Sequence, residues 1–188
     1  MTDISELLII KELQLPHKSI ALDWCHAASG RPSFGGVYAF WWRRGAQNFY
    51  DLLQNKSLHF PGPHGISLEL KITLDSLEVA QNGLLPLYVG KATDIAKRVG
   101  LHVKLKTRRT VEADAVNGIC KRMTTSCQVR DRLDRLFPNY PDTRTLALDN
   151  LALSYVRLDG PGSFVERFFF EDLAVGILRP IFNVDSER

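Results

Sequence analysis

The chain has 188 residues, of which 45% are hydrophobic and 24% are charged, a composition ordinary for a soluble globular protein. The length of the chain, residues 1–188, fits one domain with additions better than two domains. No apolar run approaches the roughly 20 residues that span a membrane, and the N-terminal residues lack the basic-then-apolar layout of a signal peptide. We therefore expect an intracellular, cytoplasmic protein with no membrane partner.

Cysteine and histidine spacing argues against two further classes of protein. The three cysteines form no C-x-x-C pair, and the five histidines form no H-x-x-x-H pair. An odd number of cysteines without that spacing is unlike a disulfide framework or a zinc site. The sequence therefore predicts no disulfide framework and no structural metal site.

Charge is unevenly distributed along the chain. The net charge is +3, but residues 104–135 contain nine basic and four acidic residues. Such a segment is a candidate electrostatic footprint for nucleic acid, and a solvated helical surface is the alternative explanation. The basic residues that we expect to contact the nucleic-acid backbone are Lys104, Lys106, Arg108, Arg109, Lys121 and Arg122.

In chain order, the first predicted element is a short amphipathic helix over residues 3–14. Residues 36–42 are aromatic and β-branched and predict a strand. Residues 43–66 form a polar, turn-rich excursion, and alternating apolar residues predict a half-buried strand over 66–74. If the first strand alternates, one of its faces carries Val37, Ala39 and Trp41 and the other carries Tyr38, Phe40 and Trp42.

The chain is organised around residues 87–102, where a strand, a glycine turn and a helix are expected in succession. An apolar run over 85–89 predicts the strand, and Gly90-Lys91 predicts the turn. Thr93-Asp94 marks the helix start, because the hydroxyl of the threonine can accept a hydrogen bond from the first helical turn.

Residues of the helix that follows fall on two faces. Ile95 and Val99 are four residues apart and suit a buried stripe. Arg98 and His102 are also four residues apart and share a different face. A cation and an imidazole side by side after a glycine turn are suited to hold an anion.

The second half of the chain adds further elements. Residues 104–148 are expected to be helical or irregular, 151–158 form a strand, and 181–184 are extended. Strands with helices between and after them predict a small mixed sheet of the α+β or α/β kind.

A long helix is predicted over residues 164–178. Ser163 and Glu166 have the spacing of a capping box at its start, and apolar residues on nearly every side predict a buried helix. Glu171 lies on an apolar stripe, where a carboxylate must be paired, protonated or bound to a cation. A salt bridge to Arg167, four residues earlier, and a metal ion are equal alternatives.

Two tripeptides and the residues that follow them resemble the GIY-YIG nuclease superfamily. Gly36-Val37-Tyr38 stands where the first family tripeptide would be, and Tyr88-Val89-Gly90 matches the second. Arg98 follows ten residues after Tyr88, and His102 follows four residues later. The E…P-x-x-N ending of the family is matched by Glu171, Pro180 and Asn183.

The resemblance covers a core of about 34–42, 84–103 and 150–184, with an insertion at 43–83 and the basic segment 104–148 outside it. It looks closest to the nuclease domain of the bacterial excision-repair incision subunit, whereas the histidine is more typical of homing and restriction members. The fold that it implies is a small, mostly antiparallel sheet flanked by helices.

The activity that the resemblance implies is hydrolysis of DNA phosphodiesters with one divalent cation, Mg²⁺ or Mn²⁺. In this scheme Glu171 would ligate the metal, Arg98 would bind a phosphate oxygen, and Tyr38 would act as general base. Lys91 would favour the phenolate by its charge, and Asn183 would support the site. Tyr88 and His102 would orient water or phosphate.

Several alternatives stay open at this point. Glu166 is a rival acid for Glu171, although the capping box already accounts for it. A restriction-type enzyme that cuts a palindrome would need a homodimer. A non-catalytic nucleic-acid-binding module that keeps the fold is the alternative to an endonuclease.

Overall fold

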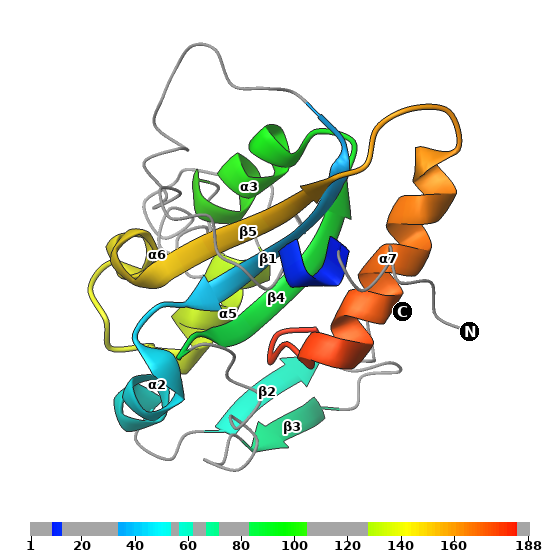
Figure 1. Ribbon diagram of the computed structural model, residues 1–188. Helices are drawn as coiled ribbons and strands as arrows, with labels where there is room; N and C mark the ends of the chain where they lie inside the picture. Colours follow the sequence, from blue (N-terminus) through cyan, green and yellow to red (C-terminus); the bar gives the residue numbers. More distant parts are fainter. Residues whose placement is uncertain are drawn as a thin grey trace.

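The computed structural model describes residues 9–12, 34–53, 57–61, 67–71, 83–104 and 128–183. Its centre is a three-stranded antiparallel sheet in the order β4-β1-β5, and strands β2 and β3 pair separately (Figure 1). The strands are β1 (Gly36–Trp42), β2 (Ser57–Pro61), β3 (Ser67–Lys71), β4 (Leu85–Ala92) and β5 (Leu151–Arg157). The helices are α2 (Gly45–Leu53), α3 (Ile95–Lys104), α5 (Gln128–Leu136), α6 (Thr143–Asn150) and α7 (Ser163–Leu178). The mixed α+β class expected from the sequence is confirmed.

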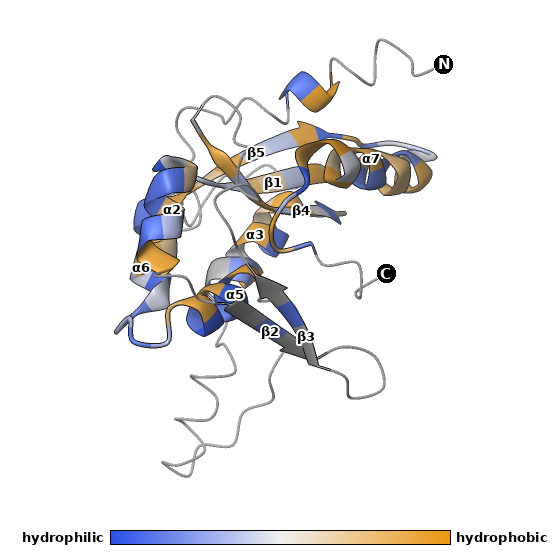
Figure 2. Ribbon diagram, turned by 90° about the horizontal axis from the view of Figure 1, so that it is seen from below, coloured by the Kyte–Doolittle hydropathy of each residue, from blue (hydrophilic) through white to orange (hydrophobic). Residues whose placement is uncertain are grey.

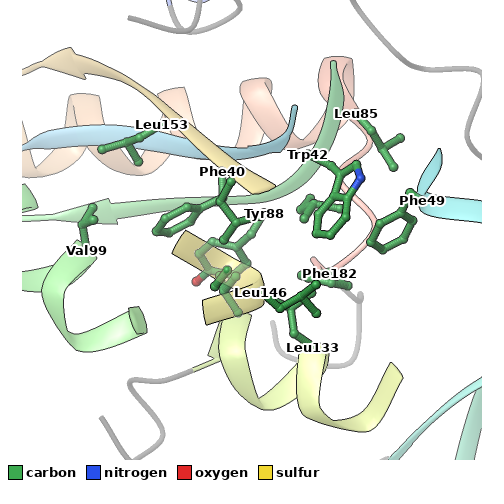
Figure 3. Packing of buried hydrophobic residues seen from close by; sticks show 14 of the residues in the cluster. Phe40, Trp42, Phe49, Leu85, Tyr88, Val99, Leu133, Leu146, Leu153 and Phe182 are labelled. Atoms are coloured by element: carbon green, nitrogen blue, oxygen red, sulfur yellow. The ribbon is translucent and has the colours of Figure 1, made fainter. Parts of the chain in front are cut away.

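The central strand β1 is buried along its whole length and divides the interior into two hydrophobic cores. Helix α7 lies on one side of the sheet, and α3 and α5 lie on the other (Figure 2). The alternation expected for this strand is confirmed. The core on the α3 side contains Tyr38, Phe40 and Trp42, and the core under α7 contains Val37, Ala39 and Trp41. Figure 3 shows Phe40 and Trp42 in the first of these cores.

Strand β1 pairs closely with β5, and two local contacts explain its sequence. A Cβ atom on Gly36 would lie 2.0 Å from the backbone oxygen of Val156, so only glycine fits there. The indole N–H of Trp41 donates a 2.7 Å hydrogen bond to Ser154 Oγ. This bond satisfies the polar atom of a fully buried side chain.

Several predicted element boundaries differ from the observed ones. The expected polar excursion over 43–66 contains helix α2, whose Phe49 and Leu53 are buried, and strand β2. The strand predicted over 66–74 coincides with β3, with 66 and 72–74 outside the described residues. Of the helix predicted over 3–14, the described residues 9–12 are helical.

The junction between β4 and α3 also differs in detail. Strand β4 continues to Ala92, so Gly90 and Lys91 lie within the strand and not in a turn after it. The helix cap is Asp94 and not Thr93, because Asp94 Oδ1 accepts a 2.9 Å hydrogen bond from the backbone N–H of Lys97.

The start of α7 does not contain the predicted capping box. Gly162 is the N-cap residue, with a φ of 85°, and no side chain caps the helix. Ser163 is already helical, and its hydroxyl accepts a 2.7 Å hydrogen bond from Arg167 Nη1. The interpretation of Ser163 with Glu166 as a reciprocal cap is therefore wrong, and Glu166 is exposed.

Helix α7 is also not the fully buried helix that its composition predicts. One face packs on the sheet through Phe170, Ala174 and Leu178. Elsewhere on its surface the helix exposes large apolar side chains, with exposed fractions from 38% to 68%, at Phe164, Val165, Phe168, Phe169 and Ile177. A helix that is apolar all round is here half covered and not enclosed.

No helix in the described part of the chain combines the length and the hydropathy that crossing a membrane requires.

Candidate active site

Four of the residues expected at the site lie together on the α3 side of the sheet. They are Tyr38 from β1, Tyr88 from β4, and Arg98 and His102 from α3, and we call them the tyrosine–histidine cluster. Tyr38 Oη and His102 Nε2 are 2.8 Å apart, and the ring centroids of Tyr88 and His102 are 5.1 Å apart. The four-residue spacing on α3 turns both Arg98 and His102 toward the strands.

Burial and neighbouring charges shift the two ionisable rings of this cluster in opposite directions. Burial, with the neighbouring Tyr88, raises the pKa of Tyr38 well above its usual value, and the charge and hydrogen bond of Arg98 oppose that rise. Burial, with the charges of Arg98 and Arg132, lowers the pKa of His102 to about 3. The imidazole is therefore neutral near pH 7. In an anion site formed by Arg98 and His102, only the arginine would carry a positive charge.

Gly90 allows the two tyrosines to pack against β4. Its register partner on β1 is Tyr38. A Cβ atom on Gly90 would lie 2.7 Å from Tyr38 Oη and 2.8 Å from Tyr88 Cε1. The glycine of the second tripeptide is thus required by a close approach within a strand and not by a turn.

We expect the substitution Gly90→Ala to lower the free energy of unfolding by about 1–3 kcal/mol, because the methyl group must displace one of two buried rings. Chemical denaturation followed by the fluorescence of the buried Trp41 and Trp42 measures this change. The matched control is Gly100→Ala in α3, where the added methyl group meets no atom within 4 Å. Alanine there should stabilise the helix by about 0.5–1 kcal/mol. Equal denaturation midpoints for the two variants would contradict the close approach.

Glu171 forms an ion pair with Lys91 on the α7 side of β4. The register of β4 places Lys91 opposite Val37, which faces the α7 core, and the ammonium also lies 4.8 Å from the centre of the Phe168 ring. Glu171 adds to the rise in the pKa of Tyr38, so the pair and the tyrosine–histidine cluster are electrostatic neighbours.

The salt bridge between Arg167 and Glu171 is not present. Arg167 is 8% exposed and turns toward the end of β5, where its Nη1 donates to Leu158 O at 2.8 Å and to Ser163 Oγ at 2.7 Å. The structure also gives Lys91 a different role from the one expected, because its charge neutralises Glu171 and is not among the causes of the shifted pKa of Tyr38.

Asn183 holds the outer edge of β4. Its Oδ1 accepts from Val89 N–H and its Nδ2 donates to Val89 O, both at 2.8 Å. The neighbouring Phe182 N–H donates to Leu87 O at 2.7 Å. The segment after α7, expected to be extended, thus turns back to support the strand that carries Tyr88 and Lys91.

The donor atoms suit a weakly held metal ion and not a closed metal centre. Among the described residues, no group of three or more His, Cys, Asp or Glu side chains is arranged to hold a metal ion. Glu171, whose side chain is 18% exposed, supplies one carboxylate. Mg²⁺ is commonly held by one or two carboxylates, with water and substrate phosphates as the other ligands, so this residue fits it.

The expected nucleic-acid contacts are largely beyond what the structure describes. Lys104 is the last residue of α3, and the side chains expected to follow it, Lys106, Arg108, Arg109, Lys121 and Arg122, lie outside the described residues. Farther along the basic segment, Arg130 and Arg132 are buried and Arg135 pairs with Asp131. In this described part of the segment, these three arginines are packed inside the protein or paired with one of its carboxylates.

Arg132 is the residue near the site that sequence reasoning missed. It lies 30 positions after His102 and lowers the pKa of that histidine. The one sequence signal for this arginine is its place in the basic segment 104–135, which by sequence alone is a candidate nucleic-acid contact.

Comparisons of the chain with protein-family models, curated proteins and solved structures found no match.

Proposed function

We propose that the chain is a divalent-metal-dependent endonuclease that hydrolyses phosphodiester bonds in DNA, with a site of the GIY-YIG kind. The observation that carries the proposal is the 2.8 Å contact between Tyr38 Oη and His102 Nε2, with the cationic Arg98 acting on both rings. A buried phenol, a neutral imidazole and a fixed guanidinium in one cluster match the needs of phosphodiester hydrolysis.

Arg98 would bind a non-bridging oxygen of the scissile phosphate. Its guanidinium keeps its charge at any relevant pH, and its planar fork suits two phosphate oxygens. The side chain is half-buried at the border of the cluster, so its charge is less screened than at an open surface. It would stabilise the charge that grows on the phosphate during attack.

Tyr38 would take a proton from the attacking water, with His102 holding the phenol in position and Arg98 favouring the phenolate. A phenolate on its own is disfavoured here, because burial raises the pKa of Tyr38. The neutral imidazole 2.8 Å away would orient the phenol by accepting its hydrogen bond at Nε2, and Arg98, whose charge lowers the pKa of Tyr38, would favour the phenolate. Tyr88, in ring contact with both, would hold this pair in place.

Glu171 would hold the Mg²⁺ or Mn²⁺ ion. Such an ion supplies Lewis-acid stabilisation of the leaving oxygen when it is bound. Glu171 lies on α7, whose packing against β1 and β4 fixes the position of the carboxylate relative to Lys91.

Cleavage of supercoiled plasmid DNA by the full chain tests the proposal. We expect nicked or linear product with Mg²⁺ or Mn²⁺ and none with EDTA, and the isosteric variant Glu171→Gln should give no product with either metal. Glu166→Gln is the matched control, because it removes an exposed carboxylate from the same helix. Cleavage that persists in EDTA, or in Glu171→Gln, would contradict a metal-dependent site at this residue.

A second candidate is a non-catalytic nucleic-acid-binding module. Two observations favour it: the side chain of Tyr38 is 0% exposed, and the Glu171 carboxylate already has Lys91 as its partner. Such a module would retard labelled DNA in a gel-shift assay, and it would leave plasmid intact in Mn²⁺. Binding that survives Glu171→Gln and Tyr38→Phe without any nicking would favour this function.

A further inference from the structure

We propose that Lys91 is a latch on Glu171, which keeps the carboxylate from binding a divalent cation until a phosphodiester draws the ammonium away. The inference rests on the proposed function, because it takes Glu171 as the residue that holds the metal. Lys91 then acts as a positioning residue that links metal binding to substrate binding.

The latch is visible in the contacts of the Lys91 ammonium. It forms an ion pair with Glu171 Oε2, and the two side chains are 32% and 18% exposed. The aromatic ring of Phe168, one helical turn before Glu171, lies 4.8 Å from the same ammonium. A carboxylate and a ring on α7 thus hold one cation between them.

The backbone of Lys91 is fixed while its side chain can move. Lys91 pairs with Val37 on the inner side of β4, and Asn183 binds the outer edge of that strand two residues earlier, at Val89. A lysine side chain has four carbons and three rotatable donors, so the ammonium can change partners without a change in the strand.

Competition for one carboxylate gives the latch its effect. A divalent cation that binds Glu171 must displace the ammonium, so the free protein should bind the metal weakly. A phosphodiester offers Lys91 another anionic partner, and it also offers the metal further oxygen ligands. Metal and phosphodiester would then each raise the affinity for the other, since coupling between two ligands is reciprocal.

Binding of Mn²⁺ alone to the full chain, without DNA, tests the latch. We expect Lys91→Met to bind Mn²⁺ about tenfold more tightly than the wild type, measured by the loss of the free-ion EPR signal on titration. Lys91→Arg keeps a cation at the position and should bind as weakly as the wild type. The gain should vanish in the double variant Lys91→Met, Glu171→Gln.

The matched control is Lys97→Met, which removes an exposed lysine from α3 and changes the net charge equally. If Lys91→Met binds Mn²⁺ no more tightly than Lys97→Met, the latch is wrong, and metal-dependent cleavage by the wild type would still uphold the nuclease. Tighter binding that depends on Glu171, together with intact plasmid, would instead support the latch and overturn the nuclease.

Discussion

Replacement of Arg98 by alanine is expected to reduce plasmid cleavage by about 10³-fold, near the upper end for a residue that stabilises transition-state charge. The guanidinium acts on both partners of the Tyr38–His102 contact, by charge and by a hydrogen bond to the phenol. Its loss would remove the expected phosphate ligand and would also raise the pKa of Tyr38 further, since Arg98 opposes that rise.

Single-turnover cleavage of supercoiled plasmid with the protein in excess measures the expected effect on the chemical step. Arg98→Lys should lie between the wild type and alanine, because lysine keeps the charge but lacks the planar fork. Arg44→Ala is the matched control, because it removes an exposed arginine from the turn after β1. A rate for Arg98→Ala equal to that of Arg44→Ala would exclude Arg98 from the reaction.

The parts of this site that could be predicted from sequence are those that follow from the regular residue periodicity of strands and helices. Alternation in β1 has a period of two, so the side of the sheet that Tyr38 faces follows from its immediate neighbours. The four-residue spacing of Arg98 and His102 likewise places them on one face of α3 whatever the rest of the fold does. These local rules were sufficient for both elements, and their boundaries changed only by a few residues.

The partner of Glu171 could not be found by such rules. A helix offers its own i−4 neighbour as the obvious partner, yet Arg167 is drawn away by the carbonyl of Leu158 and the hydroxyl of Ser163. The actual partner, Lys91, is 80 residues distant in the sequence, and it reaches the carboxylate only because α7 packs against β4. An ion pair between distant residues depends on how a helix packs against a strand. The spacing of residues within either element does not predict that packing.

The exposed face of α7 shows a related limit. A composition that is apolar on nearly every side predicts a buried helix. The sheet covers one side, and the side that carries Phe164 and Phe169 is 68% and 66% exposed at these two residues. The hydrophobicity of a helix shows how much apolar surface it could bury. The number of elements that pack against the helix decides how much of that surface is covered.

Acid should destabilise the protein strongly through His102. Its pKa is lowered from 6.5 to about 3 in the folded protein, so the unfolded chain binds a proton that the folded chain does not between these values. The free energy of unfolding should therefore fall by up to about 1.4 kcal/mol for each pH unit below about 6.5, until the folded histidine itself is protonated near pH 3. Above about pH 6.5 this histidine should contribute no pH dependence.

Urea denaturation at a series of pH values from 7.5 to 4.5, on the wild type and on His102→Gln, isolates this contribution. Glutamine cannot take up the proton and still offers Tyr38 a hydrogen-bond acceptor. The difference in the free energy of unfolding between the two proteins should shrink as the pH falls, because only the wild type loses stability through this residue. The exposed His59, replaced by glutamine in the same way, serves as the control and should keep the pH dependence of the wild type.

The outcome also bears on the chemistry of the site. If wild type and His102→Gln lose stability in parallel as the pH falls, the pKa of His102 is the same in the folded and unfolded protein, and the imidazole is charged below about pH 6.5. Its Nε2 could then accept no hydrogen bond from the phenol of Tyr38 below that pH, and the neutral buried imidazole proposed above would be contradicted. If the two curves converge toward acid, the imidazole is neutral at pH 7, as an acceptor of a hydrogen bond from the phenol 2.8 Å away must be.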